Sequence, residues 1–226
     1  MPPADTGLRE SLVAVAAELD ALGMNRGSTG NLSVRSSDRQ GFWITPTGMG
    51  AGELSPEALV WMGDVGEVQG AWKPSSEWPF HRAIYRCRPD LGAVLHTHSI
   101  NATAVACLRR ELPAFHYMVA VAGGNHVPCT GYHLFGTEAL SSAVAEAFAH
   151  RHACLLANHG LVAGGHTLEH ASRVLVEVEA LCEIYLKALA VGEPVVLGAS
   201  EMAAVIDRFA TYGKAQTSGD TSLSGA

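Results

Sequence analysis

The sequence is poor in cationic residues. Its 226 residues include 15 Lys and Arg against 22 Asp and Glu, which gives a formal net charge of -7. Proteins that bind nucleic acids neutralise phosphates with clustered Lys and Arg, so this deficit argues against a nucleic-acid partner. We expect the partners to be small molecules or protein.

Long apolar runs are also absent, because no uncharged apolar stretch reaches the roughly 18 residues that a membrane span requires. The first ten residues, MPPADTGLRE, lack the basic segment followed by an apolar core that marks a secretory signal. We therefore expect a cytoplasmic protein with no membrane partner. A hydrophobic fraction of 48% with 16% charged residues is typical of a well-packed globular protein.

The sequence shows no internal repeat and no convincing linker. A chain of 226 residues is long enough for one domain with a sizeable core. We expect a single domain over residues 1–213. Residues 214–226 are rich in Ser, Thr and Gly and are predicted to be a disordered tail.

Cysteine is sparse, and its pattern excludes two kinds of site. The five cysteines are odd in number and form no CxxC pair, so neither a disulfide framework nor a thiolate zinc site is expected. We interpret all of them as buried apolar thiols: Cys87, Cys107, Cys129, Cys154 and Cys182. Histidine, in contrast, occurs eleven times, which directs attention to metal-ligand geometry.

Hydrophobic periodicity predicts alternating helices and strands. Helical spacing indicates helices over residues 6–22, 100–108, 137–150, 167–190 and 200–212, and capping residues place a further helix start near Ser75 and Ser76. Short apolar runs predict strands over residues 31–35, 41–45, 59–62, 92–97, 117–122 and 153–157. After His159 the chain is expected to return to helix. This order favours an α/β sheet covered by helices on both faces, with the strand directions left open.

Three histidines suggest a metal site. His96 and His98 are two residues apart at the end of a predicted strand, so their imidazoles project from the same face. A lone His-X-His pair is more often a pair of ordinary polar residues, but His159 also follows a predicted buried strand, at a turn formed with Gly160. Three neutral imidazoles with an open fourth position are typical of catalytic zinc. The other histidines show no such convergence, and most of them are interpreted as surface or core residues: His81, His116, His126, His133, His150, His152, His166 and His170.

Glu77 is the candidate acid/base. It follows a run of capping hydroxyls at a predicted helix start. On position alone, a carboxylate that interacts with the helix dipole is the more common interpretation, so Glu77 by itself decides nothing.

Three short segments could bind an anion. They are Gly27-Ser28-Thr29-Gly30-Asn31, Thr45-Pro46-Thr47-Gly48 and Ser75-Ser76. Glycine lets the backbone approach an oxyanion, and a helix N-terminus presents unpaired N–H donors. Each segment alone is more often a turn or a cap. None matches a P-loop or a dinucleotide fingerprint, so nucleotide binding is not indicated.

Together with the histidines, these segments form a longer pattern. It consists of GMNRGSTGNLSVR, ITPTGM, KPSSEWPFHRAIYRCRPD, AVLHTHS, PAFHYMVAVAGGN, FGT and NHGLV, in that order. With this pattern the chain resembles the class II aldolase/adducin family over nearly its whole length, and most closely the L-fuculose-1-phosphate aldolases within it. Each segment alone would be weak, but the set is highly specific.

The resemblance implies a role for each matched residue. His96, His98 and His159 would bind one Zn²⁺ per chain, and Glu77 would be the acid/base that rests on the metal until substrate displaces it. Tyr117 would serve the aldehyde half of the substrate from a neighbouring subunit. The implied phosphate site comprises Thr29, Gly30, Asn31, Thr47, Gly48, Ser75 and Ser76, and the implied walls of the aldehyde pocket are Phe135, Phe209 and Tyr212.

The resemblance also implies an architecture and an assembly. The family fold is a single three-layer α/β domain with a largely antiparallel central sheet between helical layers. Family members of this type form a cyclic homotetramer whose active sites lie between subunits, so a symmetric assembly is expected here.

The implied reaction is retro-aldol cleavage of C3–C4 in a ketose 1-phosphate, such as L-fuculose 1-phosphate, to dihydroxyacetone phosphate and a small aldehyde. Several rivals use the same kind of site: a ribulose-phosphate 4-epimerase, a methylthioribulose- or 5-deoxyribulose-phosphate aldolase or dehydratase, and a sugar-acid phosphate decarboxylase. Tyr117-Met118 followed by Gly123-Gly124-Asn125 favours an aldolase. A non-catalytic adducin-like interaction module is disfavoured, because all three histidines and Glu77 are present and a long basic tail is absent.

Overall fold

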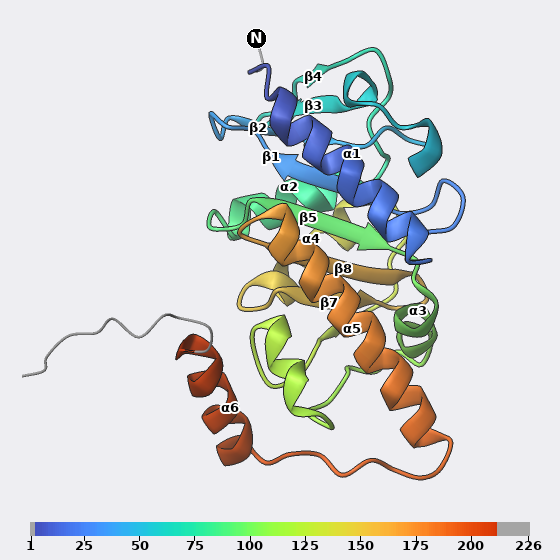
Figure 1. Ribbon diagram of the computed structural model, residues 1–226, viewed down its shortest axis with the longest axis vertical. Coiled ribbons are helices and arrows are strands. Elements are labelled where there is room, and N and C mark those ends of the chain that lie inside the picture. Colours follow the sequence, from blue (N-terminus) through green and yellow to red (C-terminus); the bar gives the residue numbers. More distant parts are fainter. Residues whose placement is uncertain (1–2, 212–226) are drawn as a thin grey trace, which may run out of the picture.

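The computed structural model describes residues 3–211, which are organised around one eight-stranded sheet (Figure 1). The strand order is β4-β3-β2-β1-β5-β8-β7-β6, and neighbouring strands run antiparallel except for the parallel pair β6 and β7. The strands are β1 (Asn31–Arg35), β2 (Gly41–Ile44), β3 (Val60–Gly63), β4 (Val68–Gln69), β5 (Ala93–Thr97), β6 (Cys129–Thr130), β7 (Ala153–Leu156) and β8 (Gly160–Gly165).

Helices cover both faces of the sheet. One layer contains α1 (Thr6–Ala21), α3 (Ile100–Cys107), α5 (Leu168–Leu189) and the 3-10 helix η3 (Tyr117–Ala122). The other layer contains α2 (Trp78–Cys87) and α4 (Glu138–Phe148). The remaining helices are η1 (Ala51–Glu53), η2 (Pro56–Ala58) and α6 (Ala199–Thr211), the last of which lies beside η3 (Figure 1).

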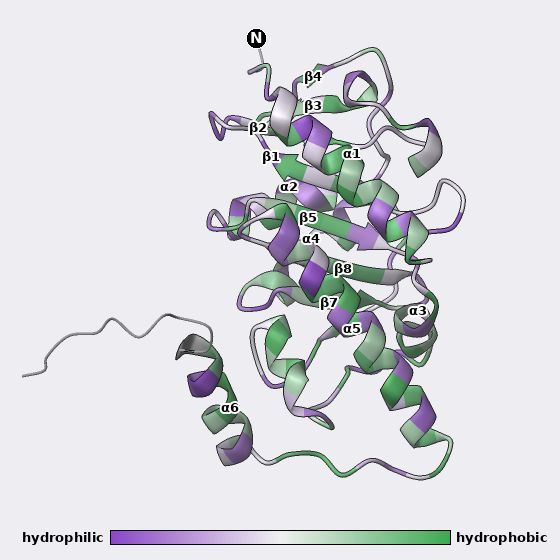
Figure 2. Ribbon diagram, viewed as in Figure 1, coloured by the Kyte–Doolittle hydropathy of each residue, from purple (hydrophilic) through white to green (hydrophobic). Residues whose placement is uncertain are grey.

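The alternation of side chains along each strand produces two cores. In β5, Ala93 and Leu95 pack towards α1 and α5, whereas Val94 packs towards α2 and α4. Figure 2 shows the matching pattern on α1 and α5, where hydrophobic and hydrophilic residues alternate along the helices. This arrangement confirms the expected three-layer α/β fold with a largely antiparallel sheet.

Two predicted elements were wrong. Residues 117–122 form the 3-10 helix η3 instead of a strand, with the His116 side chain accepting a hydrogen bond from the Met118 N–H at its start and Gly123 in the left-handed conformation at its end. The segment after His159 is strand β8 instead of helix, so His159 occupies a tight β7–β8 hairpin. A Cβ at Gly165 would collide with the backbone of α5, which explains why this glycine-rich strand can lie so close to the helix.

The cysteines also differ from the prediction. Cys154 and Cys182 are buried, but Cys87 and Cys107 are exposed and Cys129 is half-buried. Both exposed thiols lie at helix C-termini, where an apolar type does not imply burial. Burial raises the pKa of Cys129 to about 11.

Two predictions fall on residues that the structure does not describe. They concern Tyr212 and the tail 214–226. Within residues 3–211, no helix combines the length and apolar character needed to cross a membrane.

Candidate active site

The three predicted ligand residues come together. The imidazole rings of His96, His98 and His159 are 4.8 to 4.9 Å apart between centroids, and one ligand atom from each lies within 4.8 Å of the others. The Nε2 atoms of His96 and His98 are 3.1 Å apart. The rings therefore converge on a space in which one cation could contact all three, the arrangement of a catalytic zinc site with an open position.

The sheet fixes His96 and its tautomer. His96 is fully buried in the central strand β5, between β1 and β8. Its Nδ1 lies 2.9 Å from the Leu161 carbonyl oxygen in β8. A carbonyl only accepts, so Nδ1 carries the proton and Nε2 presents a lone pair to the site.

His98 and His159 are placed by the ends of their strands. His98 follows β5 directly, and His159 sits between β7 and β8. Gly160 lies against the Thr97 carbonyl, and a side chain there would also come within 3.2 Å of His96 and His98. Glycine at this position is what allows the hairpin to bring His159 next to the other two rings.

Glu77 joins the imidazoles from the N-terminus of α2, where it is the N-cap residue but makes no side-chain cap hydrogen bond. Its carboxylate lies 3.3 Å from His96 Nε2 and 3.4 Å from His159 Nε2. Only 7% of the residue is exposed, and within the described chain its Oε1 has no hydrogen-bond donor. A cation held by the three imidazoles would satisfy this buried oxygen, so the donor set fits a metal.

The local electrostatics favour neutral His98 and His159 rings and an ionised Glu77 carboxylate. Burial lowers the pKa of both His98 and His159 to about 4, and His96 adds to each shift. Burial alone would raise the pKa of Glu77, but His96, His159 and a hydrogen bond from Asn31 together hold it well below its usual range. These are the protonation states that metal coordination requires.

The predicted anion-binding segments line the same cavity of about 300 Å³. Backbone hydrogen bonds join two of them, from the Ser75 N–H to the Thr45 carbonyl and from the Thr47 N–H to the Lys73 carbonyl. Ser75 Oγ accepts the Glu77 N–H at 3.3 Å, so its own proton is free to point into the cavity. The predicted phosphate residues that line the cavity are Thr29, Gly30, Asn31, Thr47, Gly48, Ser75 and Ser76.

Asn31 lines the cavity and also contacts the candidate acid/base. It is 4% exposed, its amide N–H donates to Glu77 at 2.9 Å, and its amide oxygen faces His81 at 2.6 Å. One amide N–H of Asn31 is therefore engaged by Glu77, and its amide oxygen is engaged by His81. The neighbouring Gly30 has φ +78° and packs so closely that a Cβ would lie 2.6 Å from the His96 carbonyl.

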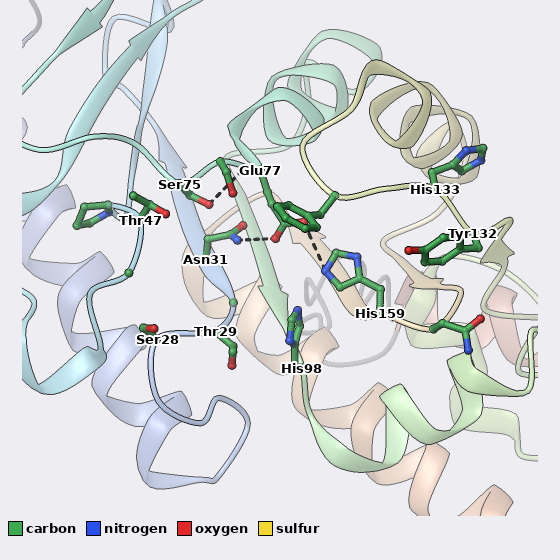
Figure 3. A pocket seen from close by; sticks show the side chains of 16 residues that line it. Ser28, Thr29, Asn31, Thr47, Ser75, Glu77, His98, Tyr132, His133 and His159 are labelled. Carbon is green, nitrogen blue, oxygen red and sulfur yellow. Dashed lines mark hydrogen bonds and ion pairs between the residues drawn. The ribbon is translucent and has the colours of Figure 1, made fainter.

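Figure 3 shows the cavity with hydroxyl residues on one side and Tyr132 and His133 on the other, while Glu77, His98 and His159 lie between them. Phe135 also lines the cavity and is 60% exposed. The sequence reasoning missed Tyr132, and it treated His133 as an ordinary surface or core residue. Neither belongs to a motif with a recognisable chemical spacing, so only their place in the fold identifies them.

The structure does not bring every predicted site residue into this cavity. Tyr117 and Phe209 are absent from its lining within the described chain and instead contact each other, with ring centroids 6.4 Å apart. Tyr117 is 49% exposed on η3, and Phe209 lies on α6. This aromatic contact lies where α6 packs beside η3.

Comparisons with known proteins agree with this fold. Residues 10–186 match the family model described as class II aldolase and adducin N-terminal domain. The chain is 48% identical over 213 residues to a 5-methylthioribulose-1-phosphate/5-deoxyribulose-1-phosphate aldolase of Rhodospirillum rubrum, covering 94% of this chain and 96% of that protein. It is 45% identical over 207 residues to an L-fuculose phosphate aldolase of Escherichia coli K12, covering 91% and 95%.

A solved structure titled L-fuculose 1-phosphate aldolase superposes with a TM-score of 0.87 at 40% identity, covering 90% of this chain and 96% of that one. The chain therefore belongs to the class II aldolase family. It is an enzyme of the lyase class.

Proposed function

We propose that this protein is a zinc-dependent aldolase that cleaves C3–C4 of a ketose 1-phosphate to dihydroxyacetone phosphate and a small aldehyde. The observation that carries the proposal is the convergence of His96, His98, His159 and Glu77 beside a cavity that is lined on one side by hydroxyls and glycines. A metal centre beside an anion cradle suits a phosphorylated substrate with adjacent carbonyl and hydroxyl oxygens.

Zinc is proposed because three imidazoles with an open fourth position are a usual ligand set of catalytic zinc. We expect one ion per chain, held by the three imidazoles. When bound, it supplies Lewis-acid stabilisation of the negative charge that develops on the substrate oxygens, an effect worth several kcal/mol.

The protein's own groups have separate tasks in this proposal. Ser75, Ser76 and Thr47 bind the phosphate, which fixes the substrate with its C2 and C3 oxygens towards the histidines. Glu77 takes and returns the proton on the dihydroxyacetone phosphate half. Tyr117, supplied by a neighbouring subunit of a homotetramer, exchanges a proton with the C4 oxygen on the aldehyde half. Phe135 would wall the aldehyde pocket, together with Phe209 and Tyr212 from the C-terminal segment.

The aldehyde half has two supported candidates. The E. coli relative is named for fuculose phosphate, whose cleavage would release lactaldehyde. The R. rubrum relative is named for methylthioribulose and deoxyribulose 1-phosphates, whose cleavage would release an aldehyde without the additional hydroxyl. The chain is 48% identical to the R. rubrum relative and 45% identical to the E. coli relative. The higher identity to the R. rubrum relative supports the deoxy or methylthio sugar as the alternative substrate. We also propose a cytoplasmic location and a single domain over residues 1–213.

Metal content tests the ligand assignment independently of catalysis. We expect His98→Ala to lose stoichiometric zinc after purification and dialysis, while His150→Ala, a change at an exposed histidine outside the cavity, keeps it. Undiminished zinc in His98→Ala would contradict the assignment.

A further inference from the structure

A buried polar seam joins strand β1 to helix α2 beneath the active site. Asn31 and Ser33 are two residues apart and share one face of β1, while Glu77, His81 and Tyr85 recur every four residues from the start of α2. Two strand residues span about 6.6 Å and four helical residues about 6 Å. The spacing of the polar residues on β1 therefore matches their spacing on α2. All five residues are less than 9% exposed.

Hydrogen bonds run along this seam without a gap. Tyr85 Oη lies 2.9 Å from Ser33 Oγ, which lies 2.7 Å from His81 Nδ1. His81 Nε2 lies 2.6 Å from Asn31 Oδ1, and Asn31 Nδ2 lies 2.9 Å from Glu77 Oε2. The chain of contacts therefore ends on the carboxylate of the proposed acid/base.

Only one direction of donation is chemically consistent. An ionised Glu77 can only accept, so Asn31 must present its NH₂ group to it and its carbonyl oxygen to His81. That oxygen in turn can only accept, so His81 Nε2 carries a proton. Burial lowers the pKa of His81 to about 3, so the ring is neutral and Nδ1 accepts from the Ser33 hydroxyl.

This chain orients groups but cannot conduct protons. The amide of Asn31 interrupts it, because an amide N–H is not released to a carboxylate at neutral pH. Tyr85 therefore cannot act as a distant acid for Glu77. What the seam does is fix the orientation of the Asn31 amide, because a reversed amide would place its oxygen against the carboxylate and its NH₂ against the protonated His81 Nε2.

We propose that His81 is a positioning residue for the reaction: its neutral, Nε2-protonated ring locks Asn31 so that the amide donates to Glu77. The proposal rests on the proposed function, since Glu77 is its target. A buried seam of five polar groups is costly unless every group is paired, and an apolar strand–helix contact would serve packing alone. At the Tyr85 end of the seam, the Arg35 guanidinium lies 4.5 Å from the Tyr85 ring and donates a hydrogen bond to the Tyr85 carbonyl.

The test uses two substitutions of His81 that differ in hydrogen bonding. Glutamine can place an amide N–H near the original Nε2, whereas leucine has a similar bulk and no donor. We expect His81→Leu to lower kcat by about 10- to 100-fold with little change in KM, as is typical when a partner behind an active-site group is lost. His81→Gln should recover most of that loss. Tyr85 is two contacts further from Asn31 than His81 is, so Tyr85→Phe should lower kcat less than His81→Leu does.

Nitrogen-15 NMR of histidine-labelled, zinc-loaded protein reads the tautomer directly and does not depend on activity. We expect His81 to show a protonated Nε2 and an unprotonated Nδ1 at neutral pH. The opposite tautomer, an imidazolium, or a fully active His81→Leu variant would overturn the proposal. If the unaltered protein cleaves no ketose phosphate, the proposed function fails, and the tautomer measurement still decides the direction of the seam.

Discussion

At the scale of single residues, the two proposed proton-handling groups lie in different surroundings. Glu77 is buried among imidazoles, whereas Tyr117 is half-exposed beside Phe209 and outside the cavity. Their proposed tasks concern opposite halves of the substrate, so their variants should fail in different ways.

We predict that Glu77→Gln blocks both C–C cleavage and the exchange of the C3 hydrogen of dihydroxyacetone phosphate with solvent, because the base is lost. Tyr117→Phe should retain the exchange while cleavage falls by about 10² to 10⁴. Proton NMR in D₂O measures the exchange for both variants. Exchange that survives in Glu77→Gln and disappears in Tyr117→Phe would reverse the two assignments.

His81 should also make stability depend on pH. Its folded-state pKa of about 3 lies below the ordinary value of 6.5, so the folded protein binds fewer protons than the unfolded chain between these values. Its contribution is therefore complete above about pH 6.5 and is lost as the pH falls towards 3. In metal-free protein we expect His81→Gln to reduce the slope of the unfolding free energy against pH by up to about 1.4 kcal/mol per unit between pH 6 and 4. Equal slopes in urea titrations would count against a neutral buried His81.

Residue identity alone predicted part of the site. The spacing of His96 and His98 and the position of His159 at a strand end were sufficient to suggest a shared metal, and the structure brings the rings together. Asn31 was placed among the phosphate residues by the family resemblance, and sequence does not reveal which way an amide points. His81 has meaning only opposite Asn31, 50 positions away, and that pairing appears only in the fold.

At the scale of elements, a side chain from one helix holds the start of another. Glu179 of α5 accepts hydrogen bonds from the Asn101 N–H, the Asn101 side chain and the Ala102 N–H at 2.8 to 2.9 Å. These donors begin α3, whose N-cap Ser99 makes no side-chain cap of its own. Because α3 starts two residues after His98, this contact also fixes the turn that carries this proposed metal ligand.

We predict that Glu179→Ala lowers the free energy of unfolding by about 1.5 to 3 kcal/mol, because buried backbone donors lose a charged acceptor. The variant should also hold zinc more weakly. The matched control is Glu183→Ala on the same helix, whose exposed pairing with Lys187 should contribute no more than about 0.5 kcal/mol. Similar losses from the two variants in denaturant titrations would refute the capping role.

Element type was predictable where the periodicity was unambiguous. The strand that contains His96 and the long helix after Thr167 were found where they were expected. The two errors have a common cause, since residues 117–122 and 160–165 are short apolar runs without a polar face, and such runs fit strand, helix or 3-10 turn equally well. Their tertiary environment, a helix layer for one and a sheet partner for the other, decides the outcome.

At the scale of the whole molecule, local sequence patterns predict neither the strand directions nor the oligomeric assembly. Alternating strands and helices suggest parallel crossovers as readily as the antiparallel sheet observed, and only the family resemblance gave the correct directions. The proposed tetramer likewise comes from the family and not from any local signal. Tyr117 on the surface, away from the cavity of its own chain, is consistent with a site shared between subunits.

Subunit mixing tests the shared site. We predict that Glu77→Gln and Tyr117→Phe, each impaired in cleavage alone, regain activity when they are denatured together and refolded, because some sites then combine an intact Glu77 with an intact neighbouring Tyr117. Each variant refolded by itself is the control. No recovery in mixed assemblies whose size is verified by light scattering would place Tyr117 outside the neighbour's site.

The most direct test of the central claim is cleavage itself. Zinc-loaded protein is incubated with L-fuculose 1-phosphate, 5-deoxyribulose 1-phosphate and methylthioribulose 1-phosphate, and dihydroxyacetone phosphate and aldehyde are measured together. We predict equal amounts of both products from at least one of these sugars, none after chelation, and recovery when zinc is restored. An epimerised or dehydrated sugar as the only product, or cleavage that persists without metal, would contradict the account.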